Sequence, residues 1–158
     1  MTVQISIENI DKMKKQSLYN YRLLEWRTYD GDSILDVKVD YGMYRYEENV
    51  DLRLFGVDAP EIRRSKSQAH PDLEVEAGKL VRDVVSMLLE DAETVWVSSM
   101  KQKSKYSGIL GVVYADDIDV NGYLLDNNMA YPYLGGKKTK WANTDLEICI
   151  FNCNKILR

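Results

Sequence analysis

Residues 35–54, LDVKVDYGMYRYEENVDLRL, contain two runs in which apolar and polar residues alternate. The apolar residues lie at positions 35, 37, 39 and 41 in the first run and at positions 50, 52 and 54 in the second. Alternation with a period of two is typical of strands that bury one face. Gly42 follows the first run and predicts a turn, so we expect the two runs to pair as a long antiparallel hairpin.

The flanking sequence predicts further strands and helices around this hairpin. Strand patterns cover residues 19–28, 94–98 and 108–114, with a short one at 118–120. Helices are predicted from Pro71 to about Leu88, over residues 121–128, and from about Thr144 onwards. This order has too few strands for a sandwich and no parallel βαβ units. We therefore predict an α+β fold, a five-stranded Greek-key β-barrel of the oligonucleotide-binding (OB) type with about three helices.

Length and composition bound the class of protein. The chain has 158 residues, of which 45% are hydrophobic and 29% charged, as in ordinary globular domains. We expect residues 1–17 to be an N-terminal extension and residues 18–158 to form a single domain. No apolar run has the length of a membrane span, and the first seventeen residues do not resemble a signal peptide. We therefore expect an intracellular protein without membrane association; its oligomeric state is not fixed by the sequence.

The charge of the chain limits the kind of nucleic-acid contact that it can make. A formal net charge of −4 argues against a protein that coats nucleic acid non-specifically. Basic residues nevertheless gather in three short runs, at 63–66, 101–105 and 137–140. Such runs are either solvated loops or, if they converge on one cleft, a positive rim on an acidic body.

The candidate chemistry lies in residues 53–61, RLFGVDAPE, together with the acidic turn DGD at residues 30–32. Carboxylates collect a hard divalent cation, and an arginine beside them can hold a phosphodiester. Pro60 stiffens the backbone between the acids of the first motif. Each segment also has a plain structural interpretation. Asp-Gly is a common hairpin turn, the two acids beside Pro60 can be a solvated pair, and Arg53 can form a barrel-end ion pair.

Taken together, these motifs resemble the staphylococcal nuclease (thermonuclease) family. The resemblance runs from about residue 29 to residue 128, and residues 131–137, YPYLGGK, are similar to divergent, often phage-borne members. It implies a calcium-dependent nuclease that hydrolyses the phosphodiester bonds of DNA or RNA on an OB barrel. The roles it implies are Ca²⁺ binding by Asp32, Asp58 and the backbone carbonyl of Ala59, phosphate binding by Arg53, general-base catalysis by Glu61, and substrate binding by Lys105, Tyr106 and Tyr133.

Two positions depart from the family pattern: Ala59 replaces a threonine but keeps the backbone carbonyl, and the second departure affects catalysis. The family has a second catalytic arginine in a Lys-Tyr-Gly-Arg motif, and this chain has Gly108 at that position. An arginine that stabilises a transferring phosphoryl group is worth about 10³ to 10⁵ in rate. Two hypotheses follow: a nuclease of reduced activity, or a module without turnover that binds nucleic acid, a nucleotide or a protein partner. The substitution Gly108→Arg is the direct probe of these alternatives.

Overall fold

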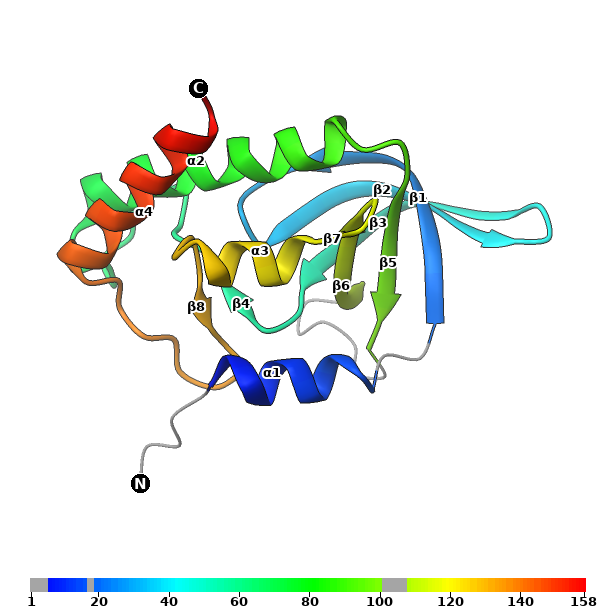
Figure 1. Cartoon of the computed structure of the whole chain (residues 1–158), viewed down its shortest axis with the longest axis horizontal. Coiled ribbons are helices and arrows are strands. Elements are labelled where there is room, and N and C mark those ends of the chain that lie inside the picture. Colours follow the sequence, from blue (N-terminus) through cyan, green and yellow to red (C-terminus); the bar gives the residue numbers. More distant parts are fainter. Residues whose placement is uncertain (1–5, 17–18, 101–107) are drawn as a thin grey trace.

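The computed structural model describes residues 6–16, 19–100 and 108–158, and its centre is a closed five-stranded β-barrel (Figure 1). Strands β1 (Tyr19–Thr28), β2 (Ser33–Gly42) and β3 (Arg45–Leu54) form an antiparallel meander. On the other side of β1 lie β5 (Val95–Ser99) and then β6 (Ile109–Ala115). Parallel pairing of β3 with β6 closes the barrel. The predicted α+β fold with an OB barrel is therefore confirmed.

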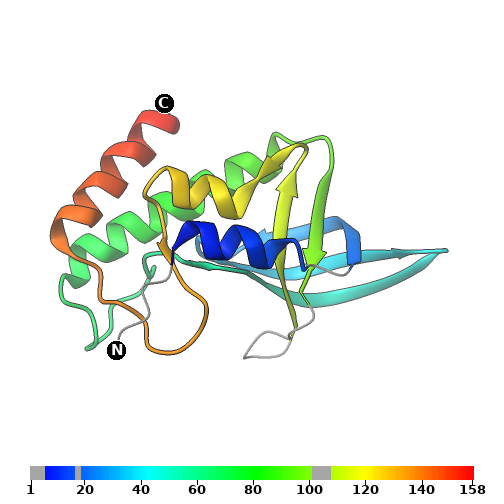
Figure 2. The same cartoon turned by 60° about the horizontal axis from the view of Figure 1, so that its bottom comes forward.

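Short strands and helices surround the barrel. Strand β4 (Val57–Asp58) pairs with β8 (Tyr131–Pro132), and β7 (Ile118–Asp119) extends β6. The helices of the described residues are α1 (Ile7–Lys14), α2 (Pro71–Glu90), α3 (Val120–Asp126) and α4 (Asn143–Ile156). Helix α4 packs on α2, and the β2–β3 hairpin projects from the opposite end of the molecule (Figures 1 and 2). In the part of the chain that the structure describes, no helix combines the length and apolar character that crossing a membrane requires.

Helix α1 was not predicted, although its residues belong to the predicted N-terminal extension. Its side chain Ile10 is fully buried in the core. A Cβ atom at Gly56 would lie 2.7 Å from Ile10 Cγ2, so the absent side chain of Gly56 makes room for this isoleucine. Lys14, in the last turn of α1, forms an ion pair of 2.6 Å with Asp119. The helix therefore packs against the turn between β3 and β4 and is tied to the N-cap residue of α3.

Strand β2 corrects one detail of the hairpin prediction. The alternation placed Leu35 on the buried face with Val37, but Ile34 is fully buried and Leu35 only partly so. Asp36 has a φ of 53°, and the pairing with β3 shifts register between Ile34 and Val37. This β-bulge inserts one extra residue, so the buried face changes phase at Asp36.

A buried amide fixes the turn that leads from β3 into β4. Asn121 of α3 is fully buried, and its Oδ1 accepts a hydrogen bond of 3.0 Å from the backbone N–H of Val113. Its Nδ2 donates to the carbonyl of Phe55 at 2.7 Å and to that of Gly111 at 3.2 Å. Such bonds contribute about 1 kcal/mol each, and losing one leaves a buried polar group unpaired. The helix thereby ties the β3–β4 turn to β6.

Candidate functional site

The turn between β1 and β2 brings two acidic residues to one end of the barrel. Asp30 Oδ1 accepts a hydrogen bond of 3.1 Å from the backbone N–H of Asp32. Between them, a Cβ atom at Gly31 would lie 2.5 Å from Val81 Cγ1 and 2.7 Å from the Cβ of Ala59. Glycine is therefore required where this turn packs against helix α2 and the segment after β4. The motif is a tight turn, and it also holds Asp32 beside the other candidate residues.

Asp32 joins the three parts of the predicted site. Its Oδ2 accepts a hydrogen bond of 3.0 Å from the backbone N–H of Ala59, and Arg53 Nη2 lies 3.7 Å from the same oxygen. Its backbone carbonyl accepts a hydrogen bond of 2.9 Å from the N–H of Leu54. The side chain is buried, with only 5% of its surface exposed. The acidic turn, strand β3 and the segment after β4 therefore meet at one carboxylate.

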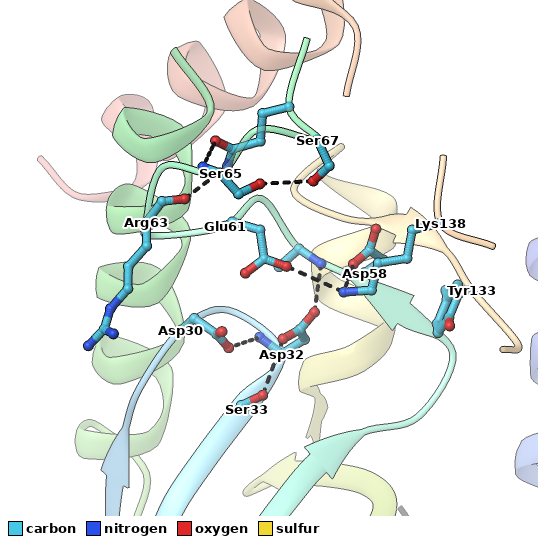
Figure 3. Close-up of polar contacts among 12 residues, drawn as sticks. Asp30, Asp32, Ser33, Asp58, Glu61, Arg63, Ser65, Ser67, Tyr133 and Lys138 are labelled. Carbon is cyan, nitrogen blue, oxygen red and sulfur yellow. Dashed lines mark hydrogen bonds and ion pairs between the residues drawn. The ribbon is translucent and has the colours of Figure 1, made fainter. Parts of the chain in front are cut away.

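The carboxylates of Asp58 and Glu61 face a lysine from a distant loop. Lys138 Nζ lies 3.0 Å from Asp58 Oδ1 and 3.3 Å from Glu61 Oε1 (Figure 3). Asp58 is buried, whereas about half of the Glu61 side chain is exposed. Among the described residues, Asp58 Oδ1 has no partner in hydrogen-bond geometry, so the ammonium group is its only polar contact there. Sequence analysis placed Lys138 in a basic run and did not connect it with these acids.

Helix α2 fixes the backbone on which Glu61 stands. A Cβ atom at Gly78 would lie 2.5 Å from the carbonyl oxygen of Glu61 and 2.7 Å from that of Pro60. The buried side chain of Glu74 accepts hydrogen bonds of 3.1 Å from the Glu61 N–H and 2.9 Å from Gln68 Nε2. Sequence analysis missed both supports, because helical periodicity marks Gly78 and Glu74 only as positions on a helix.

Burial and charge shift several pKa values in this cluster. Burial, with the charge of Asp32 as a second cause, raises the pKa of Asp30 to about 8. Burial also raises the pKa of Asp58 to about 6, although the charge of Lys138 lowers it. For Lys138, burial lowers the pKa, but the charges of Asp58 and Glu61 outweigh it and raise the value to about 12. Burial therefore disfavours the charged forms of Asp30 and Asp58.

The substitution Asp30→Asn is expected to stabilise the metal-free protein at pH 7. Asparagine keeps an oxygen acceptor for the Asp32 N–H but cannot ionise, so folding no longer requires a carboxyl to take up a proton. Because the folded-state pKa of about 8 exceeds the ordinary 3.8, the aspartate lowers stability progressively as pH rises from about 4 to 8. We expect a gain on the order of 2 to 4 kcal/mol at pH 7 and none near pH 4. Urea unfolding at both pH values measures it.

The matched control for this substitution is Asp126→Asn, at the exposed end of α3, which is expected to change stability little at either pH. A loss of stability in Asp30→Asn at pH 7 would show that the carboxylate is stabilising in the folded protein, against this prediction.

A cleft of about 540 Å³ opens beside the acid cluster. Residues of two of the three basic runs line it: Arg63 and Arg64 from the segment after β4, and Lys137, Lys138 and Lys140 from the loop after β8. The third run, at 101–105, lies outside the described residues, as do the predicted substrate residues Lys105 and Tyr106. The acidic cluster therefore adjoins a cleft that basic residues of two separate segments line.

One tyrosine begins β8 and another directly follows this strand, and the two differ in their surroundings. Tyr131 stacks on Trp141 with ring centroids 3.9 Å apart, so one face of its ring is covered. Tyr133 lies next to the cleft, with Lys138 Nζ 5.9 Å from the centre of its ring (Figure 3). The backbone N–H of Tyr133 donates to the carbonyl of Gly56 at 2.9 Å. Tyr133 is thus placed near the candidate site, and substrate binding by it stays a prediction.

The residues present fit a hard divalent cation, although they do not form a closed cage. In the described part of the chain, no three Asp, Glu, His or Cys side chains converge as a metal-binding group. The available donors are the buried carboxylates of Asp32 and Asp58 and the carbonyl of Ala59. Asp58 Oδ1 lacks a hydrogen bond, and its neighbour is the cationic group of Lys138. Ca²⁺ accepts such oxygen ligands in flexible geometry and completes its shell with water.

Comparison with models of protein families gives a match. A family model described as Staphylococcal nuclease homologue matches residues 51–147, which is more than half of the chain. The matched region begins in β3 and ends in α4, and it contains Arg53, Asp58, Glu61 and Lys138. No curated protein matches the chain significantly.

Proposed function

The chain belongs to the staphylococcal nuclease homologue family, and from this membership and its acid cluster we propose that it is a calcium-dependent nuclease that cleaves DNA. The observation that carries the proposal is the meeting of Arg53, Asp32, Asp58 and Glu61 at one end of an OB barrel. The basic walls of the adjoining cleft suit a polyanionic strand. Hydrolysis of RNA is a second activity of the same chemistry.

The position of each residue supports a specific role. Asp32, Asp58 and the carbonyl of Ala59 would hold the calcium ion, which when bound neutralises charge on the scissile phosphate. Arg53 donates hydrogen bonds from its guanidinium to a phosphate oxygen, and these bonds strengthen as negative charge builds there. Glu61 accepts a proton from the attacking water, because its carboxylate is half exposed and lines the cleft.

Digestion of labelled oligonucleotides tests this proposal. Single-stranded DNA, double-stranded DNA and RNA are incubated with the protein in calcium or in chelator, and the fragments are resolved by size. We expect fragments from DNA in calcium and none in chelator, and the RNA lanes decide whether RNA is also a substrate. The control is Asp58→Asn, which removes a proposed cation ligand. Undigested DNA in all lanes, with a folded wild-type protein, would contradict the proposal.

Gly108 favours a second candidate function, a module that binds nucleic acid without cleaving it. Gly108 has a φ of 106°, and a Cβ atom there would lie 2.2 Å from the carbonyl oxygen of Asp51. The backbone at the start of β6 therefore leaves no room for any side chain. An arginine at this position would require the backbone itself to change. Retained DNA binding in calcium without any product would favour this second function.

The same geometry changes what is expected of Gly108→Arg. We expect this variant to lose about 1 to 3 kcal/mol of stability and to gain no cleavage activity, because the side chain collides with backbone. Urea unfolding and the digestion assay measure both effects. Gly42→Arg is the matched control, since Gly42 also has positive φ (83°) but no atom within 4 Å of a Cβ. A Gly108→Arg variant that is stable and cleaves DNA faster would contradict this expectation.

A further inference from the structure

Lys138 occupies the mouth of the acid cluster. Its Nζ contacts two of the proposed active-site carboxylates, Asp58 at 3.0 Å and Glu61 at 3.3 Å. About 42% of its side chain is exposed, so the lysine approaches the acids from the cleft and not from the core. Any anion that enters the cleft towards Glu61 therefore meets this ammonium group.

The loop that carries Lys138 is anchored on both sides of it. On one side, the hydroxyl of Tyr133 donates to the carbonyl of Gly136 at 2.9 Å. Gly135 and Gly136 both have positive φ, a conformation that glycine adopts readily and other residues rarely. On the other side, Trp141 is buried and stacks on Tyr131. The chain thus turns back over the cluster and holds the lysine there (Figure 3).

Two positively charged side chains lie at different carboxylates of one cluster. Arg53 lies beside Asp32, and Lys138 lies beside Asp58 and Glu61. Gly108 cannot supply a further cation, because a side chain at this position collides with backbone. A lysine carries a compact charge on a flexible stem, and lysines are common phosphate ligands. Lys138 therefore adds a second positive charge to the acid cluster that also contains Arg53.

We propose that Lys138 is a substrate-binding residue of this site, which pairs with Asp58 and Glu61 before substrate arrives and contacts the substrate phosphate once a divalent cation takes its place at Asp58. The proposal rests on the proposed function. It makes Lys138 a second phosphate-binding residue, in addition to Arg53. Cation and ammonium compete for Asp58, so removing the ammonium should strengthen calcium binding and weaken phosphate binding. A lysine with only a structural role would not produce changes of opposite sign.

Calorimetry on the full chain separates the two effects. Calcium alone is titrated first, and deoxythymidine 3′,5′-bisphosphate is then titrated in saturating calcium. For Lys138→Met we expect calcium to bind about 3- to 10-fold more tightly and the nucleotide about 10-fold or more weakly. Lys138→Arg should keep nucleotide affinity within about threefold, because it keeps the charge. The control Lys140→Met removes a cation from the same cleft wall and should change both affinities less than Lys138→Met does.

Each outcome of these titrations decides the proposal. If the wild type binds calcium and Lys138→Met matches it in both titrations, the role of Lys138 is wrong and the proposed function stands. If Lys138→Met weakens both bindings, the lysine is only structural. If the wild type binds neither ligand, the proposed function and the role of Lys138 both fail. Lys138→Gln, a second neutral variant, decides the same question if the methionine variant is not folded, as judged by circular dichroism.

Discussion

Glu61→Gln is expected to reduce DNA cleavage by about 10²- to 10⁴-fold while leaving calcium binding nearly unchanged. The substitution keeps the size of the side chain and removes its ability to accept a proton from water. Glu61 is half exposed at the cleft, and its backbone is held by Glu74 and by the close packing of Gly78, so the fold does not depend on its charge. Initial rates on a labelled DNA strand, with calcium calorimetry, measure both properties.

Glu76→Gln is the matched control, because it makes the same change at an exposed position of helix α2. This control should cleave DNA at the wild-type rate. Wild-type cleavage by Glu61→Gln itself would exclude this carboxylate as the general base and would move that role to another group at the cleft.

Arg53→Lys is the second large effect, an expected loss of about 10²- to 10³-fold in cleavage rate. The lysine keeps the positive charge beside Asp32 but lacks the planar fork that binds two phosphate oxygens at once. The side chain of Arg53 is only 20% exposed. A lysine there has little freedom to move its ammonium group to a new position against the phosphate. Initial rates and nucleotide affinity in calcium should fall together.

The control for this variant is Arg45→Lys, at the exposed start of β3 and away from the acid cluster. It should leave cleavage unchanged. Full activity in Arg53→Lys would mean that Arg53 contributes only the ion pair at the barrel end, the plain structural interpretation of this residue.

Local patterns in the sequence were sufficient for the barrel and for half of the site. Alternation identifies strands because a half-buried strand buries every second residue. It failed at Asp36, where the bulge depends on pairing with β3, and at Tyr41, which is exposed. Asp32, Arg53 and Asp58 could be grouped because each belongs to a short motif that the resemblance orders. In the structure Asp32 contacts Arg53 and the backbone of Ala59, while the roles of these residues remain predictions.

The rest of the site depends on contacts between segments that are distant in the sequence. No local periodicity in a single sequence predicts such contacts. Lys138 and Glu61 are 77 positions apart, and they meet only because β8 pairs with β4 and the following loop turns back. The lack of space at Gly108 likewise arises from the parallel pairing of β6 with β3. Helix α1 was missed because its buried face is short and includes the single fully buried residue Ile10.

Calcium calorimetry on the wild-type protein tests the central claim most directly, because it examines the acid cluster without requiring turnover. The titration is run with and without deoxythymidine 3′,5′-bisphosphate, and Asp58→Asn serves as the variant that lacks a proposed ligand. We predict binding of calcium by the wild type, tighter binding when the nucleotide is present, and loss of this binding in Asp58→Asn. A folded wild-type protein that binds no calcium in either titration would contradict the proposal that these carboxylates form a metal-dependent nuclease site.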